Sequence, residues 1–597
     1  MTTVAAQGRN RWLRCRACHA LVYRRRMRRN LEICPECGHH QRLTAAERIG
    51  QLVDPDSFTR LADRAAEVDP LGFVDSMPYR RRLAEARAAT GMAEAVLCGA
   101  ARIGGHRAVL AVMDFRFLGG SLGCATGELI TRAAEEAFAA RDPLVLVTAS
   151  GGARMQEGVL ALMQMATVSC AIAELRAAGL LTVSVVTDPT YGGVAASFAT
   201  NTDLVIAERG ARMGFAGPRV IRETIRQALP PGFQTAEFLL RHGQVDMVVE
   251  RHDLRPRLRA LLALAAGGRA GAGPLAASAG RAARPDDGPV PVAGSTTAGT
   301  GPIPRPRPTH RTDATPTAWQ SVRTARDLAR PTTVDYLRTA FDGFVELHGD
   351  RLGADCPAIV AGLARLGDQP VAVIGQQKGH DAREMLVRNF GMASPAGYRK
   401  ALRVMGLAAR LGLPVVTLID TPGAHPGVDA EEQGQAAAIA TCLRTLARLP
   451  TPVVAVVTGE GGSGGALALA VADRVLMLQN AVYSVISPEG CAAILFHDRA
   501  AAPRAAAALQ LTAPDLVRLG VADGIVGEPP GGAQRDPAGA ADRVRAALTA
   551  ALSDLLAVPT TDLLRRRSRR FRRYGAGTVD AAVPQPDTDR TIQVMPR

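Results

Sequence analysis

Four cysteines near the N-terminus have the types and spacing of a metal site. Cys15 and Cys18 form one CxxC pair, and Cys34 and Cys37 form a second pair after fifteen intervening residues. Each pair turns two thiolates toward one point, so two pairs complete a tetrahedral sulfur shell around Zn²⁺. Such a closed shell leaves no position for a substrate, so the metal would be structural. The spacing therefore predicts a zinc ribbon within residues 1–45.

Glycines at the ends of apolar runs form a second set suited to chemistry. Gly151-Gly152 follows LVLVTAS, Gly192-Gly193 follows LTVSVVTDPTY, Gly423 ends LPVVTLIDTPG, and Gly464-Gly465 ends TPVVAVVTGEGGSGG. Between a strand and a helix, glycine lets backbone N–H groups converge on one point, where the helix N-terminus adds its positive end. Converging N–H groups can form an oxyanion hole. The alternative is that these glycines serve only tight turns and close helix packing.

No familiar side-chain catalyst accompanies the glycines. The sequence lacks GxSxG, HExxH and GxxxxGK[ST], and GEGGSGG has neither the Lys-Ser/Thr of a P-loop nor the acidic residue of a dinucleotide-binding fold. Oxyanion holes without a protein base indicate enolate chemistry in which a substrate supplies the base.

Basic side chains beside these turns are candidates for substrate contact. Lys378 and Lys400 are the only lysines among 71 basic residues, so either each marks a site where Arg does not fit or both are surface residues. Lys378 follows the apolar run VAVIG and could contact a phosphate or form a loop salt bridge. Arg154 and Arg219 follow glycine or proline turns and are further candidates for phosphate contact.

The elements that carry the glycines repeat along the chain. In each half, an apolar strand ends in glycine, a helical segment follows, and a second strand ends in glycine before a helix of small residues. Gly151 and Gly192 stand 41 residues apart, and Gly423 and Gly464 have the same separation. Alternating strands and helices of this kind predict two α/β domains of one fold, produced by internal duplication.

Composition divides the chain into five segments. They are a zinc ribbon (1–45), a first α/β domain (46–265), a linker (266–317), a second α/β domain (318–573) and an irregular tail (574–597). The linker is rich in Gly, Pro, Ala, Ser and Thr, so it cannot bury enough surface to offset its ordering entropy. We expect the linker to be disordered.

Bulk properties exclude some classes of protein. The chain has 47% hydrophobic and 21% charged residues, no secretory signal pattern and no run of eighteen apolar residues, which predicts a cytoplasmic protein. The net charge of +15 is almost wholly arginine. Such a bias indicates a GC-rich genome, so it is weak evidence for nucleic-acid binding.

Long motifs resemble the carboxyltransferase subunits of bacterial acetyl-CoA carboxylase. CRACHALVYRRRMRRNLEICPECGHHQRLTAAERI, TASGGARMQEGVLALMQMA and TDPTYGGVAASFA resemble the beta subunit. RNFGMASPAGYRKALR, IDTPGAHPGVDAEEQGQ, GEGGSGGALAL and YSVISPEGCAAIL resemble the alpha subunit, whose GHQKG stands here as Gly375-Gln-Gln-Lys-Gly379. The resemblance covers about residues 10–265 and 318–573. The linker replaces most of the helical region with which the alpha subunit usually begins.

This resemblance implies a crotonase-like fold (the ClpP/crotonase spiral) in each half and an active site between the halves. The reaction it implies moves CO2 from carboxybiotin, held in trans on a biotin carboxyl carrier protein, to acetyl-CoA, giving malonyl-CoA. It implies biotin carboxylase as a further partner, and we expect a homodimer. By position, Gly192-Gly193 and Gly464-Gly465 would each bind one oxyanion, while Gly151-Gly152 and Gly423 would shape the acyl-CoA and biotin pockets.

Three other functions remain open at the level of sequence. The first is a carboxyltransferase for propionyl-CoA or another acyl-CoA, although those relatives usually lack the four-cysteine ribbon. The second is a nucleic-acid-binding protein, which would leave the repeated glycines unexplained. The third is a non-catalytic scaffold.

Overall fold

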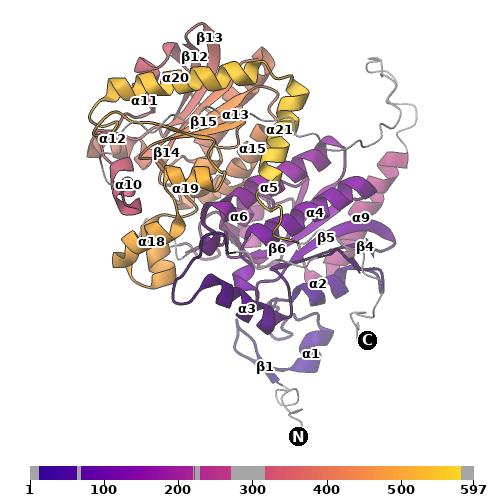
Figure 1. The fold of residues 1–597 in the computed structure, drawn as a ribbon. Helices are drawn as coiled ribbons and strands as arrows, with labels where there is room; N and C mark the ends of the chain where they lie inside the picture. Colours follow the sequence, from indigo (N-terminus) through magenta and orange to yellow (C-terminus); the bar gives the residue numbers. More distant parts are fainter. Residues whose placement is uncertain (1–11, 63–68, 219–220, 222–228, 271–315, 580–597) are drawn as a thin grey trace.

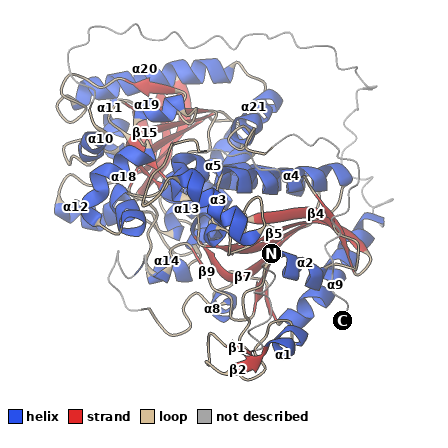
Figure 2. Ribbon diagram, turned by 60° about the horizontal axis from the view of Figure 1, so that its bottom comes forward, coloured by secondary structure: helices blue, strands red, loops and turns tan. Residues whose placement is uncertain are grey.

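The computed structural model describes residues 12–62, 69–218, 221, 229–270 and 316–579. These residues form a small ribbon and two α/β halves, here called the N-terminal half (46–270) and the C-terminal half (316–579) (Figure 1). Each half contains one mixed sheet with helices packed against it (Figure 2). Predicted residues outside these ranges, including Arg219 and most of the linker and tail, lie outside the described structure.

Each sheet has eight described strands, and corresponding strands follow the same order. The N-terminal sheet runs β10-β8-β7-β6-β5-β4-β3 with β9 beside β7, and the C-terminal sheet runs β11-β12-β13-β14-β15-β16-β18 with β17 beside β15. The N-terminal strands are β3 (Thr59–Arg60), β4 (Val96–Ile103), β5 (His106–Met113), β6 (Leu144–Ser150), β7 (Thr182–Tyr191), β8 (Leu204–Glu208), β9 (Met213–Gly214) and β10 (Met247–Val249). The C-terminal strands are β11 (Asp342–Glu346), β12 (Ile359–Leu366), β13 (Gln369–Gln376), β14 (Val415–Thr421), β15 (Val453–Gly462), β16 (Arg474–Leu478), β17 (Val482–Ser484) and β18 (Gly524–Val526).

Helices cover the sheets and join their strands. Those of the N-terminal half are α2 (Ala45–Leu52), α3 (Tyr79–Thr90), α4 (Cys124–Ala140), α5 (Gly158–Ala177), α6 (Gly192–Ala195), α8 (Ala236–Arg241) and α9 (Arg251–Ala270). Those of the C-terminal half are α10 (Ala318–Ala325), α11 (Thr333–Thr339), α12 (Ala382–Val387), α13 (Pro395–Leu411), α14 (Val428–Glu432), α15 (Gln435–Ala447), α16 (Ser463–Leu467), α17 (Pro488–Cys491), α18 (Ala502–Leu509), α19 (Ala513–Arg518), α20 (Pro537–Leu556) and α21 (Thr560–Arg572). Helix α9 extends five residues past the predicted start of the linker.

The two halves repeat one another in burial as well as in order. The hairpin β4–β5 and the hairpin β12–β13 each join two eight-residue strands, and their burial patterns match residue by residue. The parallel strands β6 and β14 are wholly buried, because helices cover both faces of a parallel sheet. The prediction of two duplicated α/β domains is therefore confirmed.

The halves pack together through α5. This helix of the N-terminal half lies against α15 and α21 of the C-terminal half (Figure 1). The Thr167 hydroxyl donates to the Phe571 carbonyl at 2.9 Å, and Arg444 donates to the Asn201 carbonyl at 3.0 Å. By length and composition, residues Met155–Ala177 could cross a membrane, but 89% of the apolar window is buried inside the molecule. Helix α5 is therefore a core helix of the two-half structure.

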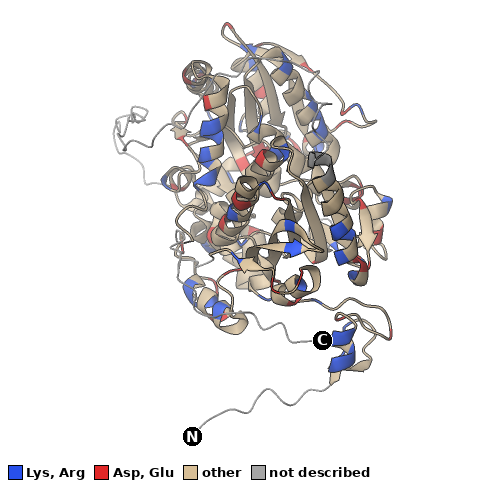
Figure 3. Cartoon of the chain, turned by 90° about the vertical axis from the view of Figure 1, so that its right-hand side faces the viewer, with Lys and Arg blue, Asp and Glu red and all other residues tan. Residues whose placement is uncertain are grey.

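The ribbon is built from β1 (Trp12–Arg14), β2 (Leu21–Tyr23) and α1 (Arg24–Arg29). Its small core of Cys15, Val22, Met27 and Cys34 is separate from the core of the two halves. Arg251 of α9 holds the ribbon by donating to the Leu31 and Gln41 carbonyls, both at 2.8 Å. Figure 3 shows acidic and basic residues interspersed over the halves, whereas α1 is almost wholly basic.

Candidate functional site

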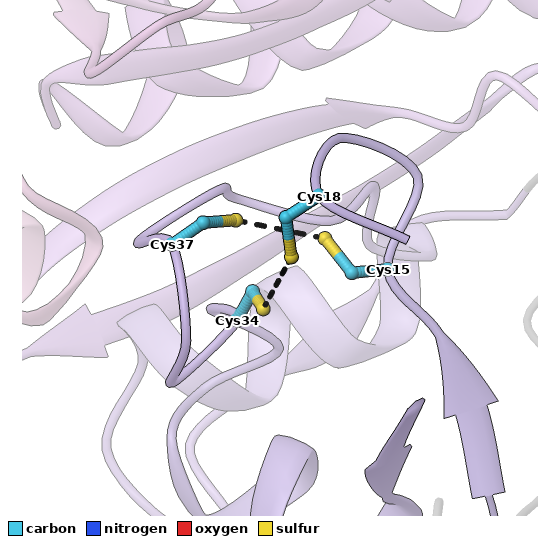
Figure 4. A group of neighbouring side chains, drawn as sticks. All are labelled: Cys15, Cys18, Cys34 and Cys37. Atoms are coloured by element: carbon cyan, nitrogen blue, oxygen red, sulfur yellow. Dashed lines mark hydrogen bonds between the residues drawn. The ribbon is translucent and has the colours of Figure 1, made fainter. Parts of the chain in front are cut away.

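The four ribbon cysteines form one compact sulfur cluster (Figure 4). Cys15 Sγ lies 3.7 Å from Cys37 Sγ, and Cys18 Sγ lies 3.9 Å from Cys34 Sγ. Tetrahedral Zn²⁺ with bonds of about 2.3 Å separates its sulfur ligands by about 3.8 Å. The cluster therefore fits Zn²⁺, and the predicted four-cysteine ribbon is confirmed.

In the N-terminal half, two glycine turns lie side by side at the ends of β6 and β7. The Ser150 hydroxyl accepts the Gly152 N–H at 3.0 Å and fixes the first turn. A Cβ added at Gly192 would lie 3.2 Å from the Gly152 Cα. Gly192 also has φ +59°, a conformation that side chains disfavour. Both turns therefore require glycine for the close approach of their backbones.

The C-terminal half contains the same pair of turns. The Thr421 hydroxyl accepts the Gly423 N–H at 3.1 Å, as Ser150 does for Gly152. A Cβ added at Gly465 would lie 2.3 Å from the Ala424 nitrogen, inside any allowed contact. Gly465 therefore serves the approach of the turns after β14 and β15.

The equivalent glycines are offset by one position from the sequence-based matching. Ser463 has φ +52° and opens α16, as Gly192 with φ +59° opens α6. Strand registers agree, since Ser150 pairs with Thr190 and Thr421 pairs with Gly461. Gly464 is therefore the counterpart of Gly193, not of Gly192, and Gly423 is the counterpart of Gly152. The separation of 41 residues holds for this corrected pairing.

Gly193 and Gly464 meet at one side chain, Met165 of α5. A Cβ added at Gly193 would lie 3.1 Å from the Met165 Sδ, and one added at Gly464 would lie 3.4 Å from its methyl carbon. Each glycine lies in the first turn of a short helix, where N–H groups have no partner within the helix. The structure thus brings together one predicted oxyanion glycine from each half of a single chain.

Glu431 of α14 joins the halves beside this point. Its carboxylate accepts the Phe215 N–H at 3.1 Å and the Ala216 N–H at 2.7 Å, across the seam between the halves. The Phe215 ring would in turn lie 3.6 Å from a Cβ at Gly464. Burial raises the pKa of Glu431 to about 7, although the two N–H groups and Gln234 act in the opposite direction.

Arg154 does not contact a phosphate in this geometry, which corrects the sequence-based assignment. Its guanidinium is 1% exposed and pairs with the Glu94 carboxylate at 2.6 and 2.8 Å. The remaining donors bond to the Ser121 hydroxyl and carbonyl and to the Tyr79 hydroxyl. Arg154 follows the Gly151-Gly152 turn, so this buried pair holds the turn from inside the protein.

Both lysines of the chain lie in ion pairs, with the Lys400 side chain buried and that of Lys378 13% exposed. Lys378 Nζ lies 2.7 Å from Asp420 and 2.7 Å from Glu460. Lys400 Nζ lies 2.6 Å from Asp355 and donates to the Cys356 carbonyl at 3.0 Å. The structure therefore shows Lys378 in a buried salt bridge, the alternative to a phosphate contact.

A cavity of about 750 Å³ lies between the ribbon and the N-terminal sheet. It is bordered by the carboxyl ends of β5 to β8, including Ala149 and Thr187, close in sequence to the glycine turns. Arginine lines its walls at Arg16, Arg42 and Arg212. The Arg42 guanidinium lies 4.2 Å above the centre of the Phe115 ring.

Sequence reasoning missed Met165, Glu431, Asp420 and Glu460. Met165 lies in an apolar helix with no pattern that distinguishes it from core residues. Glu431 contacts backbone from a distant segment, which no local pattern encodes. Asp420 and Glu460 had a signal, because each is an acidic residue at a buried strand end just before a glycine turn.

Models of known protein families match most of the chain. Residues 12–37 match an acetyl-CoA carboxylase zinc finger domain, residues 39–229 a carboxyl transferase domain, and residues 309–575 an acetyl co-enzyme A carboxylase carboxyltransferase-like family. A solved structure of transcarboxylase 12S is 20% identical over 92% of each chain with a TM-score of 0.33, a likeness too low to carry an argument.

Curated relatives resemble the chain over nearly its whole length. The acetyl-coenzyme A carboxylase carboxyl transferase subunits beta/alpha of Salinispora arenicola are 66% identical over 96% of this chain and 98% of theirs. Those of a Parafrankia species are 57% identical over 97% and 94%. The chain therefore belongs to the family of fused acetyl-coenzyme A carboxylase carboxyl transferase subunits beta/alpha.

Proposed function

We propose that this chain is the carboxyltransferase of an acetyl-CoA carboxylase, acting in fatty acid biosynthesis. It transfers CO2 from carboxybiotin on a separate carrier protein to acetyl-CoA and yields malonyl-CoA. The observation that supports this most directly is the meeting of the Gly193 and Gly464 turns at Met165. Two anion-binding turns on one site fit a reaction in which two substrates each develop negative charge.

The residues of the chain act by binding and orienting the two substrates, acetyl-CoA and carboxybiotin. Carboxybiotin, as the second substrate, supplies CO2 and, through its ureido nitrogen, the base that the sequence lacks. N–H groups of the α6 turn would bind the thioester oxygen as the methyl carbon of acetyl-CoA loses its proton, and those of the α16 turn would bind the ureido oxygen. Met165, which is 1% exposed, excludes water from the space between them.

The arginine-lined cavity beside the ribbon suits the nucleotide end of acetyl-CoA. Arg16 and Arg42 offer positive charge to phosphates, and Arg42 over Phe115 offers a planar surface to adenine. The fused subunits form one wall of this cavity with their zinc ribbon. Bound Zn²⁺ would keep that wall folded and take no part in the chemistry, because four cysteines fill its shell.

The partners follow from this reaction. A biotin carboxyl carrier protein would deliver carboxybiotin, and biotin carboxylase would regenerate it. A homodimer of the fused chain and a cytoplasmic location stay predictions. Acetyl-CoA is preferred over propionyl-CoA in this proposal, since the curated relatives are named for acetyl-coenzyme A.

Malonyl-CoA formation by the purified chain tests the proposal. We expect product from acetyl-CoA with a carboxylated biotin carrier, and a lower kcat/KM when propionyl-CoA replaces acetyl-CoA. A higher kcat/KM for propionyl-CoA would transfer the assignment to that substrate. Absence of turnover together with RNA retention on filters at moderate salt would favour the nucleic-acid-binding function instead.

A further inference from the structure

Lysine occurs at only two positions in this chain, and both side chains lie mostly inside the protein. Lys378 is 13% exposed and Lys400 is 1% exposed at the side chain, among 71 basic residues that are otherwise arginine. On the surface of this chain arginine serves as well as lysine, so a surface role would not explain why these two positions are lysine. Interior ion pairs at both positions point instead to sites that require the compact ammonium group.

Lys378 binds the ends of the two strands that carry the C-terminal glycine turns. Its ammonium bridges Asp420, the penultimate residue of β14, and Glu460, near the end of β15, at 2.7 Å each. The Asp420 carboxylate also accepts the Glu460 N–H at 2.9 Å. Gly423 follows Asp420 by three residues and Gly464 follows Glu460 by four. Displacement of either carboxylate would therefore be transmitted to both turns.

Further charges complete the cluster. Arg326 pairs with Glu460 at 2.6 Å and with Glu489 at 2.6 Å. Burial alone would raise the pKa of Glu460, but the charges of Lys378 and Arg326 hold it below its ordinary value. Both strand-end carboxylates are 11% exposed or less, so loss of Lys378 would leave Asp420 without its ion-pair partner in a poorly solvated site.

The fold itself does not require this cluster, because the N-terminal half lacks it. Phe115 lies two residues past β5, as Lys378 lies two residues past β13. By strand register, Ala149 of the N-terminal half is equivalent to Asp420 of the C-terminal half, and Pro189 is equivalent to Glu460. The positions equivalent to Lys378, Asp420 and Glu460 are thus uncharged in the N-terminal half, where the neighbouring Asp188 of β7 pairs instead with Arg212 at 2.7 Å.

We propose that Lys378 is a positioning residue that sets the Gly464 turn for transfer by locking the ends of β14 and β15. This inference rests on the carboxyltransferase function proposed above. The lysine of the QQKG segment acts through Asp420 and Glu460. Lys378 does not contact a substrate in this role.

Packing explains why the residue is lysine. A Cβ added at Gly391 would lie 2.9 Å from the Lys378 Cγ, so the lysine stem passes directly over a glycine backbone. A Cβ added at Gly391 would also lie 2.9 Å from the Asp420 carbonyl oxygen. A planar guanidinium is wider than an ammonium, so in place of the Lys378 Nζ, which lies 2.7 Å from both Asp420 and Glu460, it would have to displace these carboxylates.

Steady-state kinetics of Lys378→Met and Lys378→Arg in the full chain test the proposal. We expect kcat to fall about 10- to 100-fold in both, as for a misplacement of about 1 Å. The KM for acetyl-CoA should stay within about twofold of wild type. Lys378→Arg keeps a positive charge beside Asp420 and Glu460, so it is the more informative variant if Lys378→Met does not fold.

Lys400→Arg and Lys400→Met are the controls, because Lys400 is also an interior lysine in an ion pair, but its partners Asp355 and Cys356 do not lie at the ends of β14 or β15. We expect these variants to lower the melting temperature while kcat stays near wild type. An unchanged kcat in folded Lys378→Arg, or an equal loss of kcat in Lys400→Arg, would overturn the proposal. Wild-type turnover in the same assay separates this failure from failure of the proposed function.

Discussion

Gly193 and Gly464 occupy equivalent positions in the two halves, and both lie against the Met165 side chain. The duplication would place them on separate domains, but packing of α5 against α15 brings them to one seam. A single chain therefore places two of the predicted oxyanion glycines, one from each half, beside the same side chain.

Met165 should couple substitutions at these glycines. We expect Gly193→Ala to lower kcat about 10-fold, because its Cβ would press on the Met165 sulfur. Adding Met165→Ala should restore part of the loss, with a coupling free energy of about 1 kcal/mol in a double-mutant cycle of kcat. Strict additivity would show that Met165 and Gly193 do not share the site. Gly465→Val is a poor probe, since its Cβ would collide with backbone.

Glu431 should give the protein a pH-dependent stability. Its folded-state pKa of about 7 lies above the ordinary value of 4.5, so the folded protein holds a proton that the unfolded chain releases between these values. The contribution of Glu431 to the free energy of unfolding is then fully present below pH 4.5. This contribution is lost as the pH rises through about 7, and it amounts to roughly 3 kcal/mol.

Glu431→Gln cannot titrate and should remove this slope. Denaturant unfolding of both proteins at about pH 5 and about pH 8 measures the difference between them. Parallel pH profiles for the variant and the wild type would contradict the assignment of the slope to Glu431.

Arg154 is expected to matter for stability and not for acyl-CoA binding. Arg154→Met leaves the buried Glu94 carboxylate without its ion-pair partner, which should lower the free energy of unfolding by about 3–5 kcal/mol. Arg565→Met is the matched control, because the Arg565 pair with Asp562 is exposed and worth less than about 1 kcal/mol. A selective rise in the KM for acetyl-CoA, with unchanged stability, would restore the phosphate assignment of Arg154.

Removal of zinc should unfold the ribbon alone. The ribbon core is separate from that of the halves, so chelation or Cys34→Ser should raise amide exchange over residues 12–41 and leave the sheets protected. The ribbon forms one wall of the arginine-lined cavity, so its unfolding should also raise the KM for acetyl-CoA. Unchanged exchange in the metal-free protein would show that zinc does not hold the ribbon.

The sequence allowed prediction of the ribbon, the duplication and the glycine turns, because each depends on local spacing and strand patterning. The offset between the halves was not predictable from glycine alone, since Ser463 adopts the left-handed conformation expected of glycine. Arg154 and Lys378 were candidates by position, but their partners come from distant segments that only tertiary packing brings together. Met165 lacked any signal, because a buried methionine beside a site has the same pattern as one in a core.

Mixing two inactive variants tests most directly whether the site forms within one chain. Gly193→Val and Gly464→Val should each abolish malonyl-CoA formation, and chains co-expressed and purified together should remain inactive. If the site formed between chains of a dimer, random pairing would restore roughly a quarter of wild-type activity. We expect the mixture to stay inactive, and restored activity would contradict a site formed within one chain.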